Sequence, residues 1–290
     1  MDLYGAIEGG GTKFVCAIGD SSGKIIEKIK ISTQAPEITS QEIISFFKQH
    51  PIKKLGIGCF GPLDLNKNSA TYGSITSTPK PGWSGFNILR TLKQALNVEV
   101  ILDTDVNGAA LGEYYWGLSK QIKNLVYITI GTGIGAGILV NGETVKGLLH
   151  PEAGHMFISQ RKDDNFEGTC PFHGNLCFEG LANGPAIKNR WHVEHFSSLE
   201  KDHPAVDLEA HYIAMALVNI ICTCSPELII IGGGVTDQKA LLPKVREKTV
   251  KLLNGYVRHD RIEKEIDKYI ILPTLNENSG IMGALTLAII

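Results

Sequence analysis

The sequence of 290 residues lacks the patterns that mark several classes of protein. No run of lysine and arginine exceeds two residues and the net charge is −2, so there is no electrostatic surface for nucleic acid or an anionic membrane. No apolar run approaches the ~18 residues that span a bilayer, and the opening residues lack the basic and apolar pattern of a signal peptide. We therefore expect a cytoplasmic protein that binds neither nucleic acid nor membranes.

Cysteine is also scarce, with six residues in the chain. In a chain of this length without a signal peptide, a framework of disulfides is not expected. Four of the cysteines lie in apolar runs, which predicts buried thiols: Cys16, Cys59, Cys222 and Cys224. Cys170 and Cys177 lie instead in a polar segment with two histidines, which calls for a different explanation.

Glycine is abundant, and its 32 residues cluster in "EGGGT", "GTGIGAG" and "IGGGV". Clustered glycine lets backbone N–H groups approach a phosphate closely. The sequence has no G-x-x-x-x-G-K-[ST] motif, which excludes a P-loop. "GTGIGA" matches a loose dinucleotide motif, but the next residues continue as a strand where that motif needs a helix. Three clusters together favour a different nucleotide site.

Predicted strands alternate with predicted helices, which is typical of the α/β class. The pattern of strand, glycine-rich turn and strand that begins at Leu3 recurs from Asn124, with Gly11 and Gly131 at the two tips. This repeat predicts two similar domains that face each other across a central cleft. The main predicted helices cover residues 41–48, 87–96, 208–223, 241–253 and 279–290.

Asp103 and Asp105 follow a predicted strand and precede a helix. A carboxylate at such a position could accept the proton of a sugar hydroxyl during phosphoryl transfer. Aspartate before a helix is also a favoured N-cap. On the residues alone, capping is the stronger interpretation.

His155, Cys170, His173 and Cys177 offer two imidazoles and two thiolates in a loop with little apolar content. This set suits a closed tetrahedral zinc site, in which the metal takes the place of a missing core. The alternative is a surface loop that carries these residues by coincidence.

The motifs "GAIEGGGTK", "DTDVNGAALGE", "ITIGTGIGAGILVNG", "HPEAGH", "GTCPFHGNLCFEGLANGPA" and "IIIGGGV" resemble, in order and spacing, those of bacterial sugar kinases of the ROK family. The sequence is most similar to the fructokinase branch. The resemblance implies an actin-like ATPase (ribonuclease H-like) fold with ATP, Mg²⁺ and a hexose in the cleft, and a homodimer. The implied domains are residues 1–118 with 277–290, and residues 119–276 with a zinc loop at about 150–180.

The resemblance also implies roles for individual residues. Asp105 becomes the general base, Asn107 helps to hold the sugar, and Asp103 is structural. Thr104 stands where glucose-directed relatives often have an asparagine that contacts the sugar. Glu8 replaces the family's usual aspartate near Mg²⁺. The implied nucleotide contacts are Gly10, Gly11, Thr12, Lys13, Gly131, Thr132 and Gly133, with Gly184, Pro185, Gly232, Gly233 and Gly234 on the adenosine side.

In the second half, the resemblance implies sugar contacts by Glu152, His155 and Glu179, and a structural zinc on the four Cys and His residues. Relatives have one residue fewer before Cys177, so His150 is a possible substitute for that ligand. The expected reaction is ATP-dependent phosphorylation of D-fructose. The alternatives are a glucose, mannose or N-acetylhexosamine kinase, a sugar-sensing repressor, for which we expect no room ahead of the first hairpin, and an actin-like filament or chaperone ATPase.

Overall fold

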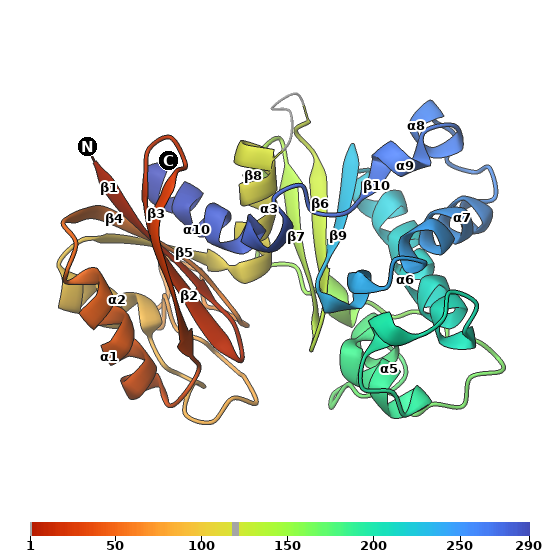
Figure 1. The fold of residues 1–290 in the computed structure, drawn as a ribbon, viewed down its shortest axis with the longest axis horizontal. Coiled ribbons are helices and arrows are strands. Elements are labelled where there is room, and N and C mark those ends of the chain that lie inside the picture. Colours follow the sequence, from red (N-terminus) through yellow and green to blue (C-terminus); the bar gives the residue numbers. More distant parts are fainter. Residues whose placement is uncertain (1, 118–121) are drawn as a thin grey trace. The chain divides into compact units, whose positions relative to one another are not determined.

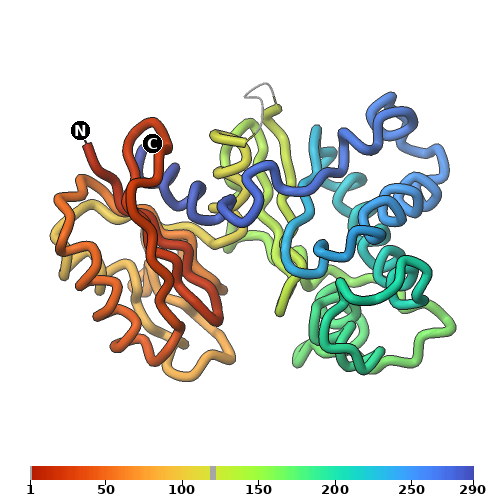
Figure 2. Tube along the Cα trace, in the orientation of Figure 1, coloured from red at the N-terminus to blue at the C-terminus, as the bar shows by residue number. Residues whose placement is uncertain are grey.

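The computed structural model describes residues 2–117 and 122–290. The chain forms two compact units: Met1–Ile122, Gly137–Pro151 and Thr274–Ile290 make the first, and Lys123–Ala136 and Glu152–Pro273 the second. The division predicted between residues 118 and 119 falls outside the described residues, and the predicted domain limits stay a prediction. Both termini belong to the first unit (Figure 2).

The first unit is built on a five-stranded sheet of order β3-β2-β1-β4-β5 (Figure 1). β1 runs antiparallel to β2 and parallel to β4, and β4 runs parallel to β5. The carboxyl ends of β1, β4 and β5 therefore lie along one edge of the sheet. The strands are β1 (Leu3–Gly9), β2 (Lys13–Asp20), β3 (Ile25–Ser32), β4 (Ile52–Cys59) and β5 (Glu99–Thr104).

Helices cover both faces of this sheet (Figure 1). Successive strand residues point to opposite faces, so Ile7 packs into the core on the side of α1 and α2, whereas Ala6 packs against α10. Both faces are apolar, which explains why these strands read as continuous hydrophobic runs. The helices are α1 (Pro36–Phe47), α2 (Ile88–Leu96), α3 (Asp105–Gly112) and α10 (Ser279–Ile289), with a π-helix at Glu113–Gly117 and a 3-10 turn at Asn276–Asn278.

Glycines let α10 lie directly against α3 and β4. A β-carbon on Gly56 would lie 1.9 Å from the carbonyl oxygen of Ala284, and one on Gly283 would lie 1.6 Å from that of Gly108. These distances are too short for any side chain. The close approach brings the start of α10 to the same edge of the sheet as the start of α3, where the predicted acidic residues lie.

The second sheet has the order β10-β9-β6-β7-β8. From its other edge, the first sheet has the order β5-β4-β1-β2-β3, so the five strands β6 to β10 take the same places as β1 to β5. β6 is parallel to β9, and β9 is parallel to β10. The α/β class and the internal repeat predicted from the glycine-rich hairpins are therefore confirmed. The strands are β6 (Leu125–Ile130), β7 (Ile134–Val140), β8 (Glu143–Thr144), β9 (Leu228–Gly232) and β10 (Ile270–Ile271).

The longest helix of the second unit is its core helix, α6. Among the described residues it alone is long and apolar enough, by length and composition, to cross a membrane, but 67% of its most apolar window is buried within the structure. The helices are α4 (Phe178–Ala182), α5 (Gly184–Trp191), α6 (Pro204–Cys224), α7 (Leu241–Leu253), α8 (Asp260–Glu263) and α9 (Ile266–Tyr269), with 3-10 turns at Ala153–His155, Phe196–Ser198 and Gly234–Asp237.

The prediction for the four cysteines in apolar runs is half right. Cys16 and Cys59 are buried, but Cys222 is exposed and Cys224 is partly exposed. Both of the latter lie in the last turn of α6, where the helix leaves the core. The apolar neighbours of a cysteine in the sequence do not reveal which side of a helix end faces the protein.

Candidate active site and metal centre

The turn between β1 and β2 presents backbone donors at its tip. The N–H of Gly10 donates to the carbonyl oxygen of Lys13 over 2.9 Å, which closes the turn. Within the described part of the chain, the N–H groups of Gly11 and Thr12 have no hydrogen-bond partner, and both residues are at least partly exposed. Free N–H groups on neighbouring residues attract an anion such as a phosphate oxygen. The first glycine cluster can therefore bind phosphate.

Glu8 lies near the end of β1, against the start of α10. A β-carbon on Gly280 would lie 2.5 Å from Cδ of Glu8, so the glycine makes room for the carboxylate, which accepts the N–H of Ile281. Burial, and to a smaller extent the charge of Asp105, raises the pKa of Glu8 to about 7, while the charge of Lys13 acts in the opposite direction. A cation beside this carboxylate would relieve both unfavourable effects.

Asp105 is the first residue of α3. Oγ1 of Thr104 accepts the N–H of Asn107 over 3.1 Å, so Thr104 fills the capping role that the sequence allowed for Asp105. Oδ1 of Asp105 accepts the N–H of Val106 over 2.9 Å. Burial raises the pKa of Asp105 to about 6, because loss of water disfavours the carboxylate, and backbone N–H groups oppose that shift. A carboxylate with this pKa is suited to act as a base near neutral pH.

Asp103 is almost fully buried, and its carboxylate connects α3 to the segment around β8. Oδ1 accepts the N–H of Thr104 over 2.8 Å and Nδ2 of Asn107 over 2.7 Å. Oδ2 accepts Oγ1 of Thr144 over 3.1 Å and lies 2.9 Å from Nζ of Lys146. The bond to Asp103 uses one of the two N–H donors of the Asn107 amide and fixes the orientation of that side chain. Sequence reasoning missed Lys146, which no local motif distinguishes.

The second glycine-rich turn is bonded to the start of α5. The N–H of Gly131 donates to the carbonyl oxygen of Gly133 over 2.9 Å, and the carbonyl oxygen of Gly131 accepts the N–H of Gly184 over 2.7 Å. Nδ2 of Asn183 donates to the carbonyl oxygen of Thr132 over 3.2 Å. The structure thus brings together residues predicted to bind nucleotide: Gly131, Thr132, Gly133, Gly184 and Pro185.

Glu179 lies beside the same turn. Its Oε2 accepts the N–H of Ile134 over 2.8 Å, and a β-carbon on Gly133 would lie 2.8 Å from that oxygen. The side chain therefore has one carboxylate oxygen bound to the backbone. Glu152 is exposed and precedes the 3-10 turn that carries His155, and its carbonyl oxygen accepts the N–H of His155 over 2.9 Å.

The third glycine cluster, residues 232–234, follows β9 and lies beside the end of β6. Gly233 has a φ of +91°, and a β-carbon there would lie 2.3 Å from the carbonyl oxygen of Ile130. β6 and β9 are parallel neighbours, so this cluster and the turn at Gly131 lie at the carboxyl ends of adjacent strands. Crevices at such ends are the usual nucleotide sites of α/β sheets.

The four predicted zinc ligands converge in the second unit. One ligand atom from each of His155, Cys170, His173 and Cys177 lies within 4.8 Å of the others. Sγ of Cys170 lies 3.7 Å from Nδ1 of His155 and 3.6 Å from Nδ1 of His173, and Sγ of Cys177 lies 3.9 Å from Nδ1 of His155. Both cysteines are buried and both histidines are partly exposed.

These separations fit a tetrahedral zinc ion. Bonds of about 2.3 Å to sulfur and 2.0–2.1 Å to nitrogen place the two atoms about 3.6 Å apart across a tetrahedron. The longer loop before Cys177 does not remove that residue from the cluster. The substitute considered for it, His150, instead accepts the N–H of Leu63 at its Nε2 over 3.1 Å.

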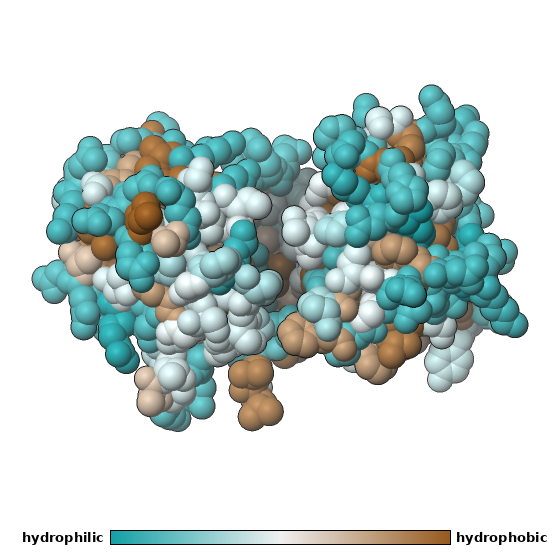
Figure 3. Space-filling model, turned by 90° about the horizontal axis from the view of Figure 1, so that it is seen from below, coloured by the Kyte–Doolittle hydropathy of each residue, from teal (hydrophilic) through white to brown (hydrophobic). Residues whose placement is uncertain are grey.

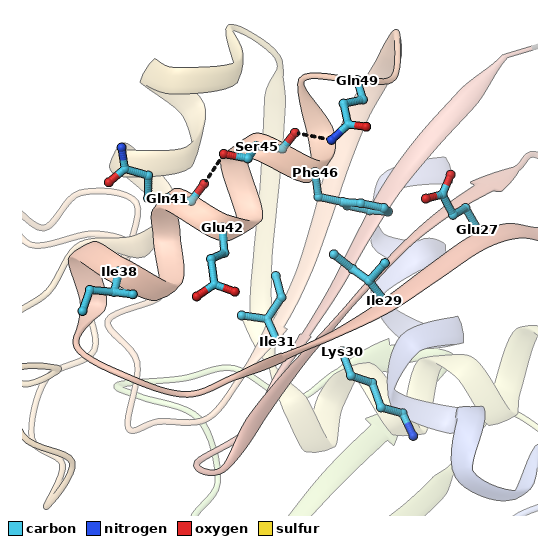
Figure 4. Close-up of a pocket in the computed structure, with 10 residues that line it drawn as sticks. All are labelled: Glu27, Ile29, Lys30, Ile31, Ile38, Gln41, Glu42, Ser45, Phe46 and Gln49. Carbon is cyan, nitrogen blue, oxygen red and sulfur yellow. Dashed lines mark hydrogen bonds between the residues drawn. The ribbon is translucent and has the colours of Figure 1, made fainter.

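A groove of the first unit lies away from all of these residues. It runs between β3 and α1, where Ile29, Ile31, Ile38 and Phe46 supply apolar side chains and Glu27 and Glu42 supply charge, whereas the side chain of Lys30 extends from the other side of β3 (Figure 4). None of the residues predicted to act in catalysis or binding lines it.

Comparison with known proteins adds evidence at the level of sequence. The model of the ROK family matches residues 4–290. The chain is 45% identical over 286 residues to a protein of Bacillus subtilis named putative fructokinase, covering 99% of this chain and 95% of that one. It is 44% identical over 289 residues to a fructokinase of Lactococcus lactis subsp. cremoris, covering 98% and 96%.

Solved structures are similar in fold. A ROK hexokinase from Thermus thermophilus has a TM-score of 0.77 at 24% identity, covering 99% of this chain and 97% of that one. A ROK family glucokinase from Streptomyces griseus, in complex with glucose and AMPPNP, has a TM-score of 0.77 at 22% identity, covering 99% of both chains. These likenesses confirm the actin-like ATPase fold predicted from the motifs.

Proposed function

This chain belongs to the ROK family, and from that membership we propose that it is an ATP-dependent kinase that converts D-fructose to D-fructose 6-phosphate. The observation that carries the substrate is the set of relatives named fructokinase, which are 41–45% identical over nearly the whole chain. The chemistry rests on the partly buried carboxylate of Asp105 at the edge of the first sheet.

The proposed reaction is a direct transfer. The 6-hydroxyl oxygen of fructose attacks the γ-phosphorus of ATP, the bond from that phosphorus to the β–γ bridging oxygen breaks, and ADP leaves with the electron pair. Asp105 accepts the proton of the hydroxyl group as the new bond forms. Its pKa of about 6 supports this role, because the group is ionised at neutral pH and still basic enough to take a proton.

The proposed contacts divide between the two ligands. The donors at the first hairpin bind the phosphates, and the carbonyl oxygen of Asn107 accepts a sugar hydroxyl. Mg²⁺ bound with ATP would supply positive charge to the phosphate oxygens, and Glu8 is the carboxylate that would help to hold it. The other proposed nucleotide residues are Gly10, Gly11, Thr12, Lys13, Gly131, Thr132, Gly133, Gly184, Pro185, Gly232, Gly233 and Gly234, and the other proposed sugar residues are Glu152, His155 and Glu179.

We propose a structural zinc ion on His155, Cys170, His173 and Cys177. Two thiolates and two imidazoles fill a closed tetrahedral site, so the ion has no open position for water. Its proposed effect is to fix the loop that carries Glu152 and His155. The separations of 3.6–3.9 Å between three pairs of sulfur and nitrogen atoms support it.

Fructose is proposed over glucose in part because of Thr104. Its hydroxyl caps α3 and the residue is 3% exposed, so it does not offer the amide that the resemblance assigns to glucose-directed relatives. A kinase for glucose, mannose or an N-acetylhexosamine is the alternative within the family.

The remaining proposals concern the cellular compartment of the enzyme and its partners. All six thiols are free, which supports a reducing compartment such as the cytoplasm. Phe157, Phe172 and Leu176 are more than half exposed on the zinc loop, which supports a second copy of the chain as partner; we propose no nucleic-acid or membrane partner. On the face drawn in Figure 3, hydrophobic residues form small groups in a largely hydrophilic surround.

The decisive experiment is an ADP-release assay of the purified chain with Mg²⁺ and ATP across fructose, glucose, mannose and N-acetylhexosamines. We expect the highest kcat/KM with D-fructose and fructose 6-phosphate as the product. A higher kcat/KM with another hexose would reassign the substrate, and no hexose-dependent release of ADP would overturn the kinase.

A further inference from the structure

The loop that follows β4 is anchored on the first phosphate hairpin by an aromatic cluster. The indole of Trp83, 1% exposed, stacks on Phe14 with ring centroids 5.4 Å apart and an interplanar angle of 20°. Phe60 and Phe86 meet the same indole edge-on at 5.5 and 5.4 Å, and Nε1 of Trp83 donates to the carbonyl oxygen of Gln34 over 2.8 Å. Because Phe14 is the second residue of β2, this cluster fixes the loop to the base of the hairpin.

Lys80 lies in that loop, one turn before the tryptophan. The N–H of Trp83 donates to the carbonyl oxygen of Lys80 over 3.2 Å. Cε of Lys80 lies 3.1 Å, and its Nζ 3.8 Å, from the position that a β-carbon would take on Gly11. Since glycine has no side chain, the lysine stem lies directly on the backbone at the tip of the hairpin. Lys80 is only partly exposed.

The ammonium group has nothing anionic to bind among the described residues. The only hydrogen bond recorded for Lys80 besides the turn is from its backbone N–H to Thr78, and its side chain has no ion pair within the described ranges. Its stem lies on Gly11, whose backbone N–H, like that of Thr12, has no hydrogen-bond partner among the described residues. A charged donor and free backbone donors are thus present at the same hairpin tip, contributed by two segments of the chain.

Lys13, the other lysine of the hairpin, is placed differently. It is exposed, its carbonyl oxygen closes the turn, and its charge lowers the pKa of Glu8. Lys80, by contrast, is partly exposed and lies with its side chain against the backbone of Gly11.

We propose that Lys80 is a catalytic residue whose ammonium group binds the phosphoryl group that is transferred. The inference rests on the proposed kinase activity. During transfer, negative charge on the γ-phosphoryl oxygens and the leaving oxygen must be stabilised, and a fixed cation in a partly dry position does so effectively. A lysine acts there as a compact point charge.

The test compares Lys80→Met, which keeps the apolar stem on Gly11, with Lys80→Arg, which keeps the charge. Lys67→Ala, an exposed lysine of the same loop, is the matched control. We expect Lys80→Met to lower kcat by roughly a hundredfold, with the KM for fructose within about threefold of the wild type. Lys80→Arg retains more of the activity, and Lys67→Ala leaves it unchanged.

Binding measurements separate the γ-phosphate from the rest of the nucleotide. We expect Lys80→Met to weaken a non-hydrolysable ATP analogue by roughly tenfold or more and to leave ADP binding unchanged. The proposal is overturned by a kcat within about threefold of the Lys67→Ala control, by equal losses for ADP and the analogue, or by an effect confined to the KM for fructose. A wild-type chain that is inactive on every hexose would refute the proposed function. The dissociation constants of ADP and of the ATP analogue would still decide whether Lys80 binds the γ-phosphate.

Discussion

The side-chain amide of Asn107 donates a hydrogen bond over 2.7 Å to the carboxylate of Asp103, four residues earlier in the chain. This bond fixes the orientation of the amide. One of the two N–H donors is thereby used internally, and the carbonyl oxygen and the second N–H are left for other partners. The other carboxylate oxygen of Asp103 lies 2.9 Å from Nζ of Lys146, and we expect Asp103 to act as a positioning residue for Asn107.

We expect Asp103→Ala to lower the free energy of unfolding by about 2–3 kcal/mol, because the amide of Asn107 and the N–H of Thr104 lose a buried acceptor. The KM for fructose should rise more than kcat falls. Steady-state kinetics and denaturant unfolding measure the two effects. Lys146→Ala is the control: its side chain is half exposed, so its loss should cost less than about 1 kcal/mol. Equal unfolding free energies for the two variants would contradict a role for Asp103 beyond the ion pair.

We expect Asp105→Asn to abolish most turnover while leaving nucleotide binding intact. An amide of the same size cannot accept the proton of the sugar hydroxyl, and loss of a general base costs roughly 10²- to 10⁴-fold in rate. ADP release in the presence of fructose measures the first effect, and titration calorimetry with ADP measures the second. Turnover near that of the wild type would remove Asp105 from the role of base.

The wild-type enzyme should lose kcat/KM for fructose as the pH falls through about 6, with a slope of one. The pKa of Asp105 is raised to about 6, and only its ionised form can accept the proton. A profile measured between pH 5 and 8 at saturating Mg²⁺ and ATP tests this. The residual activity of Asp105→Asn should lack the same inflection. An inflection shared by both would assign it to another group.

The same pKa shift makes a prediction for stability, of opposite sign to that for a salt-bridged carboxylate. The folded state holds the Asp105 proton more tightly than the unfolded state, whose value is near 3.8. This contribution to stability is therefore fully present below about pH 4 and is lost as the pH rises to about 6. Without ligands, Asp105→Asn should be more stable than the wild type by about 1–3 kcal/mol at pH 8 and nearly equal to it at pH 4. Thermal unfolding at both pH values measures the difference, and a variant that is no more stable at pH 8 would contradict it.

Local patterns predicted much of the fold. Glycine clusters mark both hairpins because a tight turn after an apolar strand is encoded within about ten residues. The first helix was predicted too short, since it begins at Pro36, a residue that fits the first turn of a helix but carries no hydrophobic periodicity. Within the apolar run at residues 269–272, only Ile270–Ile271 forms a strand, which directly follows the short helix α9.

Some residues of the candidate site could be predicted from local sequence, and others could not. Three of the four proposed zinc ligands lie within eight residues of each other, so spacing alone could indicate them. The partners of Asp103 and Glu8 could not be found in this way, because Lys146 and Gly280 reach them only through the fold. Sequence also could not choose the cap of α3 among three consecutive residues that all cap helices well, and the structure gives that role to Thr104.

We expect the chain to bind about one zinc ion and to depend on it for the order of the loop that precedes α4. Cys170→Ser should lose the metal and lower the thermal unfolding temperature, because no apolar core replaces the ligands of a structural zinc. The KM for fructose should rise in this variant, since the loop carries Glu152 and His155. Cys222→Ser, which alters an exposed thiol at the end of α6, is the matched control and should keep both metal and stability. Elemental analysis of protein purified without chelators decides the point: a metal-free wild type, or a Cys170→Ser variant that retains its zinc, would overturn the site.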